Sequence, residues 1–127
     1  RTRLKHGKRG RQYAEQFLMQ DYSHEETRMV DWVQGSAMFL SKELWDELGG
    51  FDERFWMYFE DADLCRRSWD LGRPVYYHPE AVLKHGWGQA SAKEKSHIKN
   101  VLTNKVTRAH IASWIKYVLK WGVNDRI

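Results

Sequence analysis

GGFDERFWMYFEDADLCRR occupies positions 49–67, where a run of aromatic residues gives way to a helical pattern that begins with three carboxylates. The three are Glu60, Asp61 and Asp63. Acidic residues are common in the first turn of a helix, because free backbone N–H groups and the helix dipole stabilise negative charge there. Asp63 is also spaced to form an ion pair with Arg66 or Arg67. A purely structural role for the acids is therefore the first interpretation.

The residues in front of the acids favour a second interpretation. Four large rings lie within five positions, namely Phe55, Trp56, Tyr58 and Phe59. Rings crowded around carboxylates are typical of a semi-enclosed polar pocket, in which they stack on the apolar face of a sugar or a nucleotide. We therefore expect the acids to belong to a binding site.

The flanking pattern predicts short helices and strands. A helix is expected over residues 42–48, capped by Ser41 and ended by Gly49-Gly50. A second helix is expected over residues 60–71, ended by Gly72. Short strands are expected over residues 29–33, 37–40, 73–77 and 81–84.

Several motifs follow one another in an ordered series. DWVQGSAMFL spans positions 31–40, the acid motif follows at 49–66, and GRPVYY and PEAVLKH lie at 72–77 and 79–85. In this order, the block from Val30 to His85 resembles the C-terminal half of the catalytic domain of inverting family-2 glycosyltransferases, especially their bacterial rhamnosyltransferase-like branch. The resemblance implies an α/β fold that is the C-terminal part of a GT-A-type (nucleotide-diphospho-sugar transferase) fold. Short strands, packed helices and a C-terminal amphipathic helical segment would make it up.

The resemblance also implies roles for the three acids. Asp61 would be the general base that takes the proton of the acceptor hydroxyl, and Glu60 would orient acceptor hydroxyls. Asp63 is assigned to the substrate site, with helix capping or pairing to a neighbouring arginine as its other role.

Two tryptophans, a glycine and a histidine complete the implied site. Trp32 and Trp87 are candidates for stacking on sugar rings, with a place in the core as the alternative for Trp32. Gly35 would let the backbone approach the donor closely. His85 would complete the shell of a divalent metal ion, Mn²⁺ or Mg²⁺, as a neutral imidazole ligand. The loop over residues 86–91 matches the family's glycine- and serine-rich loop only loosely.

The family's nucleotide-binding half has no counterpart in this sequence. That half carries an Asp-x-Asp motif for the metal, whereas Asp61-Ala62-Asp63 belongs to the acid motif, and the chain begins at Arg1 without a Gly-rich phosphate loop. We therefore expect the acceptor-side half of a larger enzyme, inactive alone, with most metal ligands supplied by the missing half. Its expected divisions are a basic N-terminal segment (1–28), the acceptor-side half (29–90) and C-terminal amphipathic helices (91–127).

Positive charge is concentrated at the N-terminus. Residues 1–11 hold six of the chain's 21 Lys and Arg residues, and like charges mixed with glycines favour a mobile segment. Attraction to anionic lipid headgroups or to a phosphorylated substrate is the second interpretation. Nucleic-acid binding is the least favoured, because aromatic residues are not interleaved with the charges. A short helix is expected after this segment, over residues 13–19.

The cysteine content and the hydropathy of the sequence indicate where in the cell the protein is expected. The single cysteine, Cys65, excludes an internal disulfide and indicates a reducing environment, with packing as its expected role. The sequence shows no secretory signal and no apolar run of about 18 residues. The expected location is the cytoplasm, with peripheral contact at the inner face of the membrane.

The C-terminal segment is strongly amphipathic. One apolar stripe runs through residues 98–106, and a second consists of Ile111, Trp114, Ile115, Val118 and Leu119. The first interpretation is that helices pack these stripes on the domain. A membrane interface and a homodimer contact are the alternatives.

Together these features predict an inverting transferase that moves a sugar from a nucleotide-diphospho-sugar to a glycan or lipid-linked acceptor. The alternative is a non-catalytic binding or assembly module that uses the C-terminal helices and the basic N-terminus.

Overall fold

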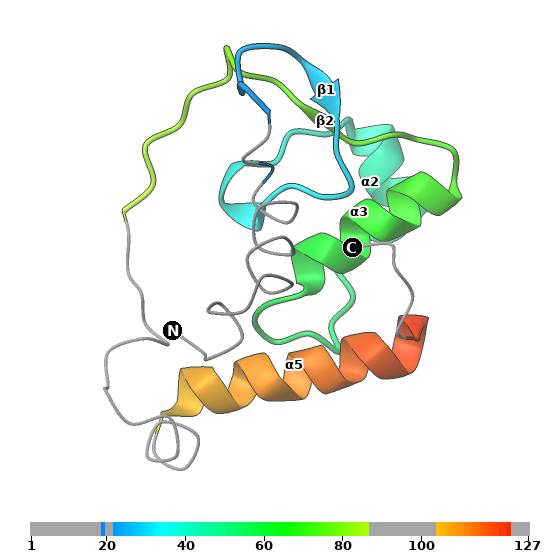
Figure 1. Cartoon of the computed structure of the whole chain (residues 1–127). Helices are drawn as coiled ribbons and strands as arrows, with labels where there is room; N and C mark the ends of the chain where they lie inside the picture. The colour runs from blue at the N-terminus through cyan, green and yellow to red at the C-terminus, as the bar shows by residue number, and fades with distance from the viewer. Residues whose placement is uncertain (1–18, 20–21, 87–103, 123–127) are drawn as a thin grey trace.

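The computed structural model describes Met19, residues 22–86 and residues 104–122. In chain order its elements are β1 (Arg28–Met29), the 3₁₀ turn η2 (Gly35–Ala37), α2 (Lys42–Leu48), α3 (Glu60–Asp70), β2 (Tyr76–Tyr77) and α5 (Lys105–Trp121). The two antiparallel strands lie at one end, α2 and α3 occupy the middle, and α5 runs along the opposite end (Figure 1). The described residues therefore combine helices with a small sheet, as the sequence predicts.

Helix α2 forms where the sequence predicts it. The Ser41 hydroxyl accepts a hydrogen bond from the Leu44 amide at 3.2 Å, which satisfies one of the free N-terminal donors. The helix ends at Gly49, whose φ of 72° is a left-handed conformation that glycine adopts without steric cost. Trp45, the helix's largest apolar residue, stays 36% exposed and packs edge-on against Phe51.

Helix α3 supplies half of the buried residues in the described part of the chain. They are Ala62, Asp63, Leu64, Cys65 and Ser68. The helix ends at Asp70 with Leu71 as its cap, and Gly72 follows with a left-handed φ of 70°, which confirms the predicted end to within one residue. Leu71 is 45% exposed rather than part of the buried stripe, because it lies past the last full turn.

The sheet is smaller than the sequence predicts. β1 and β2 pair with Arg28 opposite Tyr77, and one further bond joins the Val30 amide to the Val75 carbonyl at 2.9 Å. The predicted strand over residues 37–40 begins instead in the turn η2, and residues 81–84 form exposed coil. Strand backbone needs a neighbour for its N–H and C=O groups, and neither segment pairs with another described strand. Both strand predictions are therefore wrong.

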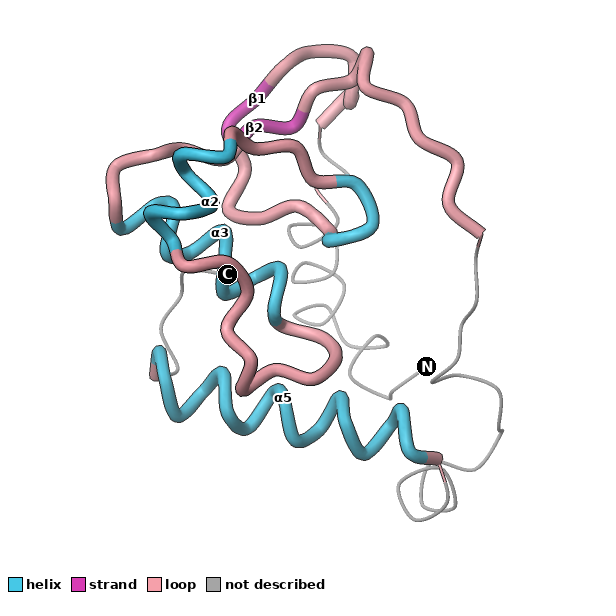
Figure 2. The backbone as a smooth tube through the Cα atoms, turned by 180° about the vertical axis from the view of Figure 1, so that it is seen from behind, coloured by secondary structure: helices cyan, strands magenta, loops and turns pink. Residues whose placement is uncertain are grey.

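Helix α5 packs with the face opposite to the expected one. Ser113 and Tyr117 are 2% and 6% exposed, whereas Ile111 and Ile115 of the predicted packing stripe are 39% and 46% exposed. Viewed from behind, the loop of residues 51–59 lies between α3 and α5 (Figure 2). The loop presents aromatic rings and a backbone carbonyl, which the tyrosine and serine match better than aliphatic side chains do. The interpretation that this stripe packs on the domain is therefore wrong.

The core joins the loop, α3 and α5. Phe55, Ala62 and Tyr117 form its buried cluster, and Phe59 and Trp121 pack against them. The predicted helix over residues 13–19 lies outside the described residues except for Met19. The basic segment 1–11 and most of the stripe over residues 98–106 lie outside them as well.

Candidate functional site

The acids follow two residues in unusual backbone conformations. Tyr58 and Phe59 have φ values of 68° and 69°, a left-handed conformation that costs energy for residues with a Cβ. Phe59 is the residue that caps α3, so this bend sets where the helix begins. Consecutive strained residues of this kind cluster at functional sites. The bend places Glu60 and Asp61 in the first turn of α3.

Asp61 is held by two backbone amides. Its Oδ2 accepts a hydrogen bond from the Gly35 amide at 2.9 Å, and its Oδ1 accepts one from the Ala62 amide at 2.8 Å. Each carboxylate oxygen can accept two hydrogen bonds, so each keeps a lone pair for a further donor. The side chain is partly exposed. The carboxylate is therefore fixed in orientation and still open to a hydroxyl group.

Gly35 approaches this carboxylate closely. A Cβ built on Gly35 would lie 3.3 Å from the Asp61 Cβ and 3.5 Å from its Oδ2. Contacts as short as 3.3 Å are tighter than most in folded proteins, so a larger residue would push the aspartate aside. The expected role of this glycine was close approach to the donor. The structure shows close approach to Asp61, and the donor contact stays a prediction.

Glu60 is partly buried at the start of α3. Its Oε2 atom is buried and has no hydrogen-bond partner among the described residues. Burial, with a smaller contribution from the negative charge of Asp61, raises the pKa of the Glu60 carboxyl. The two adjacent acids thus sit in different environments: one Glu60 oxygen is buried without a partner, whereas both Asp61 oxygens accept backbone hydrogen bonds.

Asp63 is fully buried in a network of donors. Its Oδ2 accepts from Arg67 Nε at 2.8 Å, and its Oδ1 accepts from Trp121 Nε1 at 2.8 Å and lies 2.6 Å from Lys120 Nζ. Arg67 also donates to the backbone carbonyls of Leu48 and Gly50. Of the roles expected for Asp63, the arginine pair is present, and a substrate contact stays a prediction.

A second acid ties α5 to the loop. Asp52 Oδ2 lies 2.8 Å from Lys120 Nζ, and Arg54 binds the same carboxylate through two of its nitrogens. The Arg54 hydrogen bonds, aided by Lys120, hold the pKa of Asp52 well below its ordinary value. Lys120 thus bridges two aspartates, one on the loop and one on α3.

The inner face of α5 braces the loop in front of the acids. Ser113 Oγ donates to the Met57 carbonyl at 2.8 Å. The Tyr117 ring lies 5.3 Å from that of Phe59, and the His110 ring lies 4.5 Å from that of Tyr58. Sequence reasoning missed these supports. Their signal was present, because Ser113 and Tyr117 are four residues apart on one face of a predicted helix.

The structure does not bring the other predicted site residues to the acids. His85 is exposed on the coil after β2, and Trp32 is half-buried at the wall of a cavity. Trp87 lies outside the described residues. Within the described ranges, no group of three or more His, Cys, Asp or Glu side chains could hold a metal ion. His85 as a metal ligand stays a prediction.

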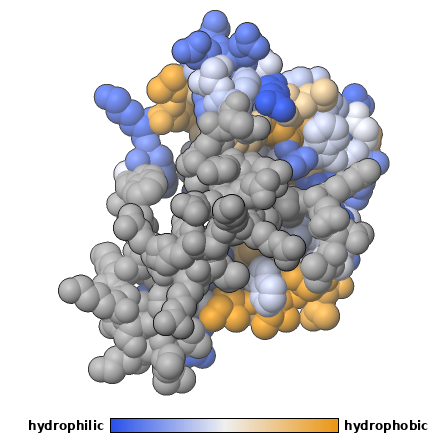
Figure 3. Space-filling model, in the orientation of Figure 1, coloured by the Kyte–Doolittle hydropathy of each residue, from blue (hydrophilic) through white to orange (hydrophobic). Residues whose placement is uncertain are grey.

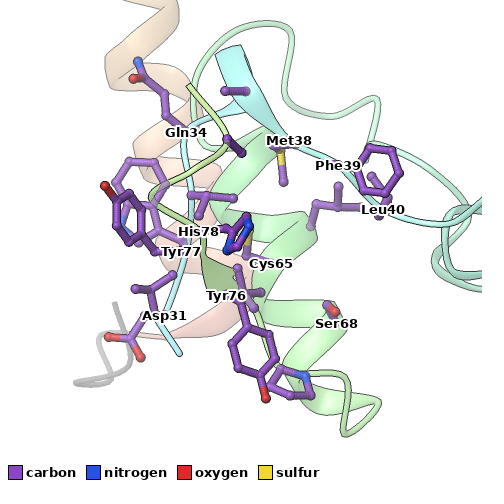
Figure 4. A pocket seen from close by; sticks show the side chains of 18 of the residues that line it. Asp31, Gln34, Met38, Phe39, Leu40, Cys65, Ser68, Tyr76, Tyr77 and His78 are labelled. Atoms are coloured by element: carbon purple, nitrogen blue, oxygen red, sulfur yellow. The ribbon is translucent and has the colours of Figure 1, made fainter. Parts of the chain in front are cut away.

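A cavity of about 1400 Å³ is lined in part by α3. Cys65 and Ser68 of α3, Tyr76 and Tyr77 of β2, and the segment 30–40 line it (Figure 4). Trp32 and Gln34 belong to this wall, and the next residue, Gly35, binds Asp61. The same segment therefore contributes to the cavity and to the acid site.

Cys65 packs inside the structure. The residue is 2% exposed, and burial raises the pKa of its thiol. Both observations confirm a packing role, because a nucleophilic cysteine needs an accessible thiolate.

None of the helices in the part of the chain that the structure describes has the length and apolar character to cross a membrane.

Comparison with known proteins gives consistent matches. The family model described as "Glycosyltransferase like family 2" matches residues 6–124. An N-acetylglucosaminyl-diphospho-decaprenol L-rhamnosyltransferase of Mycobacterium tuberculosis is 30% identical over 105 residues, which cover 79% of this chain and 34% of that protein. Rhamnosyltransferase WbbL of Escherichia coli K12 is 29% identical over 92 residues, which cover 72% of this chain and 32% of that protein. No solved structure matches significantly.

Proposed function

Because the chain belongs to the family-2-like glycosyltransferases, we propose that it forms the acceptor-side part of an enzyme that transfers a sugar with inversion. The chain spans about a third of the length of the curated relatives it matches, so the proposal concerns the complete protein. One observation supports it most: the Asp61 carboxylate is oriented by two amides and keeps lone pairs for an acceptor hydroxyl.

In the proposed reaction, the acceptor hydroxyl attacks the anomeric carbon from the face opposite to the nucleotide diphosphate. The bond from that carbon to the diphosphate oxygen breaks as the new glycosidic bond forms, and the hydroxyl proton moves to Asp61. A base that is already aligned lowers the cost of reaching this geometry. The Gly35 amide supplies that alignment from a separate segment of the chain.

We assign Glu60 to the orientation of the acceptor. Its raised pKa keeps a proton on the carboxyl to a higher pH than usual, and a protonated carboxyl can donate a hydrogen bond as well as accept one. Such a group beside Asp61 can bind one acceptor hydroxyl while Asp61 takes the proton of another.

We propose a GT-A-type fold for the complete domain, in which strands from elsewhere in the complete protein would extend the short β1–β2 pair. A divalent cation would stabilise the leaving diphosphate, but the described residues do not form a metal site on their own. His85 would be one ligand among several from elsewhere in the protein.

The substrates are proposed from the relatives. The mycobacterial relative is named as a rhamnosyltransferase acting on a decaprenol-linked N-acetylglucosaminyl diphosphate. We therefore propose a nucleotide-activated rhamnose as donor and a sugar linked through diphosphate to a polyprenol as acceptor. Sugar transfer to such acceptors would place the enzyme in polysaccharide or cell-envelope synthesis.

The test is transfer of radiolabelled sugar by the complete protein and its Asp61→Asn variant. The amide cannot take a proton, so we expect turnover to fall by about 10²–10⁴-fold while nucleotide binding is retained. Asp46→Asn is the matched control, because Asp46 is an exposed acid on α2 that pairs with Lys42. Near-wild-type turnover of Asp61→Asn would remove Asp61 from the role of base. An absence of turnover with every donor would favour the binding or assembly module.

A further inference from the structure

Helix α5 carries an exposed apolar face. Its members, here called the outer face, are Ile111, Trp114, Ile115 and Leu119, which are 39%, 53%, 46% and 81% exposed. Their spacing of three and four residues places them along one side of the helix. In the space-filling view, apolar residues gather along the lower edge, where α5 lies (Figure 3). Contiguous apolar surface of this kind marks a contact site.

The orientation of the helix is fixed by its other side. Ser113, Tyr117 and Trp121 bind or pack against the loop and α3, and Lys120 lies 2.6 Å from the buried Asp63. Rotating the helix about its axis to bury the outer face would break these contacts. It would also leave the buried Asp63 carboxylate without the donors that α5 supplies. The outer face is therefore exposed because the contacts on the other side of α5 fix the orientation of the helix.

The charges of α5 have one sign. The helix reads KVTRAHIASWIKYVLKW, with four Lys or Arg residues and no Asp or Glu. Arg108 and Lys116 are exposed, and Lys105 lies over the ring of the exposed Trp56. Lys and Arg side chains can extend past an apolar face while their stems cover it. A basic, tryptophan-bearing amphipathic helix is suited to the boundary between headgroups and acyl chains.

We propose that the outer face of α5 docks on an anionic lipid bilayer, with the helix lying in the plane of the headgroups. Trp114 sits at mid-helix on this face, and tryptophan favours the interface because its ring is apolar and its N–H is polar. The cations beside the face add attraction to anionic lipid. The inference rests on α5 alone and is independent of the proposed sugar transfer.

Charge complementarity favours lipid over a second copy of the chain. Two copies of α5 packed about a two-fold axis would bring basic helices together without an acid on either helix to offset them. A stable protein interface also buries about 800 Å² per partner, more than four partly exposed side chains of one helix supply.

The experiment is co-sedimentation of the complete protein with vesicles. Vesicles of mixed phosphatidylglycerol and phosphatidylcholine are compared with vesicles of phosphatidylcholine alone. The wild-type protein is expected to bind the anionic vesicles preferentially and to release as salt is raised. The variant Ile115→Glu/Leu119→Glu is expected to lose about tenfold or more in binding, since it puts two charges on the face that contacts lipid.

Val82→Glu/Leu83→Glu is the matched control. These residues are 79% and 70% exposed on the coil after β2, so the variant adds the same charge outside α5. It is expected to bind as well as the wild type. Equal binding by all three proteins, or no binding to either vesicle, would overturn the proposal. A dimer in sedimentation velocity that the α5 variant abolishes, without vesicle binding, would assign the face to a second copy.

Discussion

Asp61 and Asp63 lie two residues apart on the same helix and serve different purposes. Asp61 is partly exposed, and two backbone amides orient it without neutralising its charge. Asp63 is fully buried, and Arg67, Lys120 and Trp121 surround its oxygens. One residue type in one short motif thus provides both a candidate for chemistry and an anchor for architecture. The neighbours of each aspartate in the folded structure determine which of the two roles it has.

The largest effect on stability is expected from removing the anchor. Asp63→Ala leaves Arg67 and Lys120 without their shared buried partner, so we expect a loss of about 3–5 kcal/mol in the free energy of unfolding. Hydrogen exchange of the α3 and α5 amides in the complete protein measures it. The surface substitution Asp46→Ala should stay within about 0.5 kcal/mol of wild type. Unchanged exchange in Asp63→Ala would mean that packing alone holds α5.

The second largest effect is expected from disturbing the orientation of Asp61. Gly35→Ala places a methyl group 3.3 Å from the Asp61 Cβ and should shift the carboxylate by a few tenths of an ångström. We expect kcat for sugar transfer to fall about tenfold with KM little changed, because alignment and not binding is lost. Steady-state kinetics separate the two constants, and Gly35→Val should lower kcat further. A change in KM alone would argue against a positioning role.

A smaller effect is expected where α5 braces the loop. Ser113→Ala removes the donor to the Met57 carbonyl inside the structure, so we expect a loss of about 1 kcal/mol in stability. Thermal unfolding of the complete protein is the measurement, with the exposed Ser36→Ala as control. If the two variants unfold together, the bond contributes nothing measurable.

The smallest effect concerns pH. The folded protein depresses the pKa of Asp52 below its ordinary value of 3.8, so the contribution of its ion pairs is fully present above about pH 4. It is lost as the pH falls below that value and the carboxylate takes up a proton. Asp52→Asn should therefore flatten the acid limb of a plot of stability against pH. Parallel curves for variant and wild type would exclude Asp52 as a source of that limb.

The sequence predicts what local chemistry determines. The Ser41 cap, the glycine after α2 and the start of α3 depend on neighbouring residues, and all three are confirmed. The extent of the strands and the packing side of α5 depend on partners distant in the chain. There the predicted strands over 37–40 and 81–84 and the predicted packing stripe were wrong, whereas β1 and β2 overlap the other two predicted strands. The Gly35–Asp61 bond spans 26 positions, so no local pattern indicates it.

The outer face of α5 carries a geometric consequence for the acids. The helix has a diameter of about 10–12 Å with its side chains, and the residues just before Glu60 rest directly on its inner side. With α5 flat on a bilayer, it becomes a spacer that fixes the height of Asp61 above the headgroups at roughly one helix diameter. An acceptor anchored by its tail would then meet the base only if its reactive hydroxyl stands at that height. The diameter of α5 would then select acceptors by the distance between their lipid tail and their reactive hydroxyl.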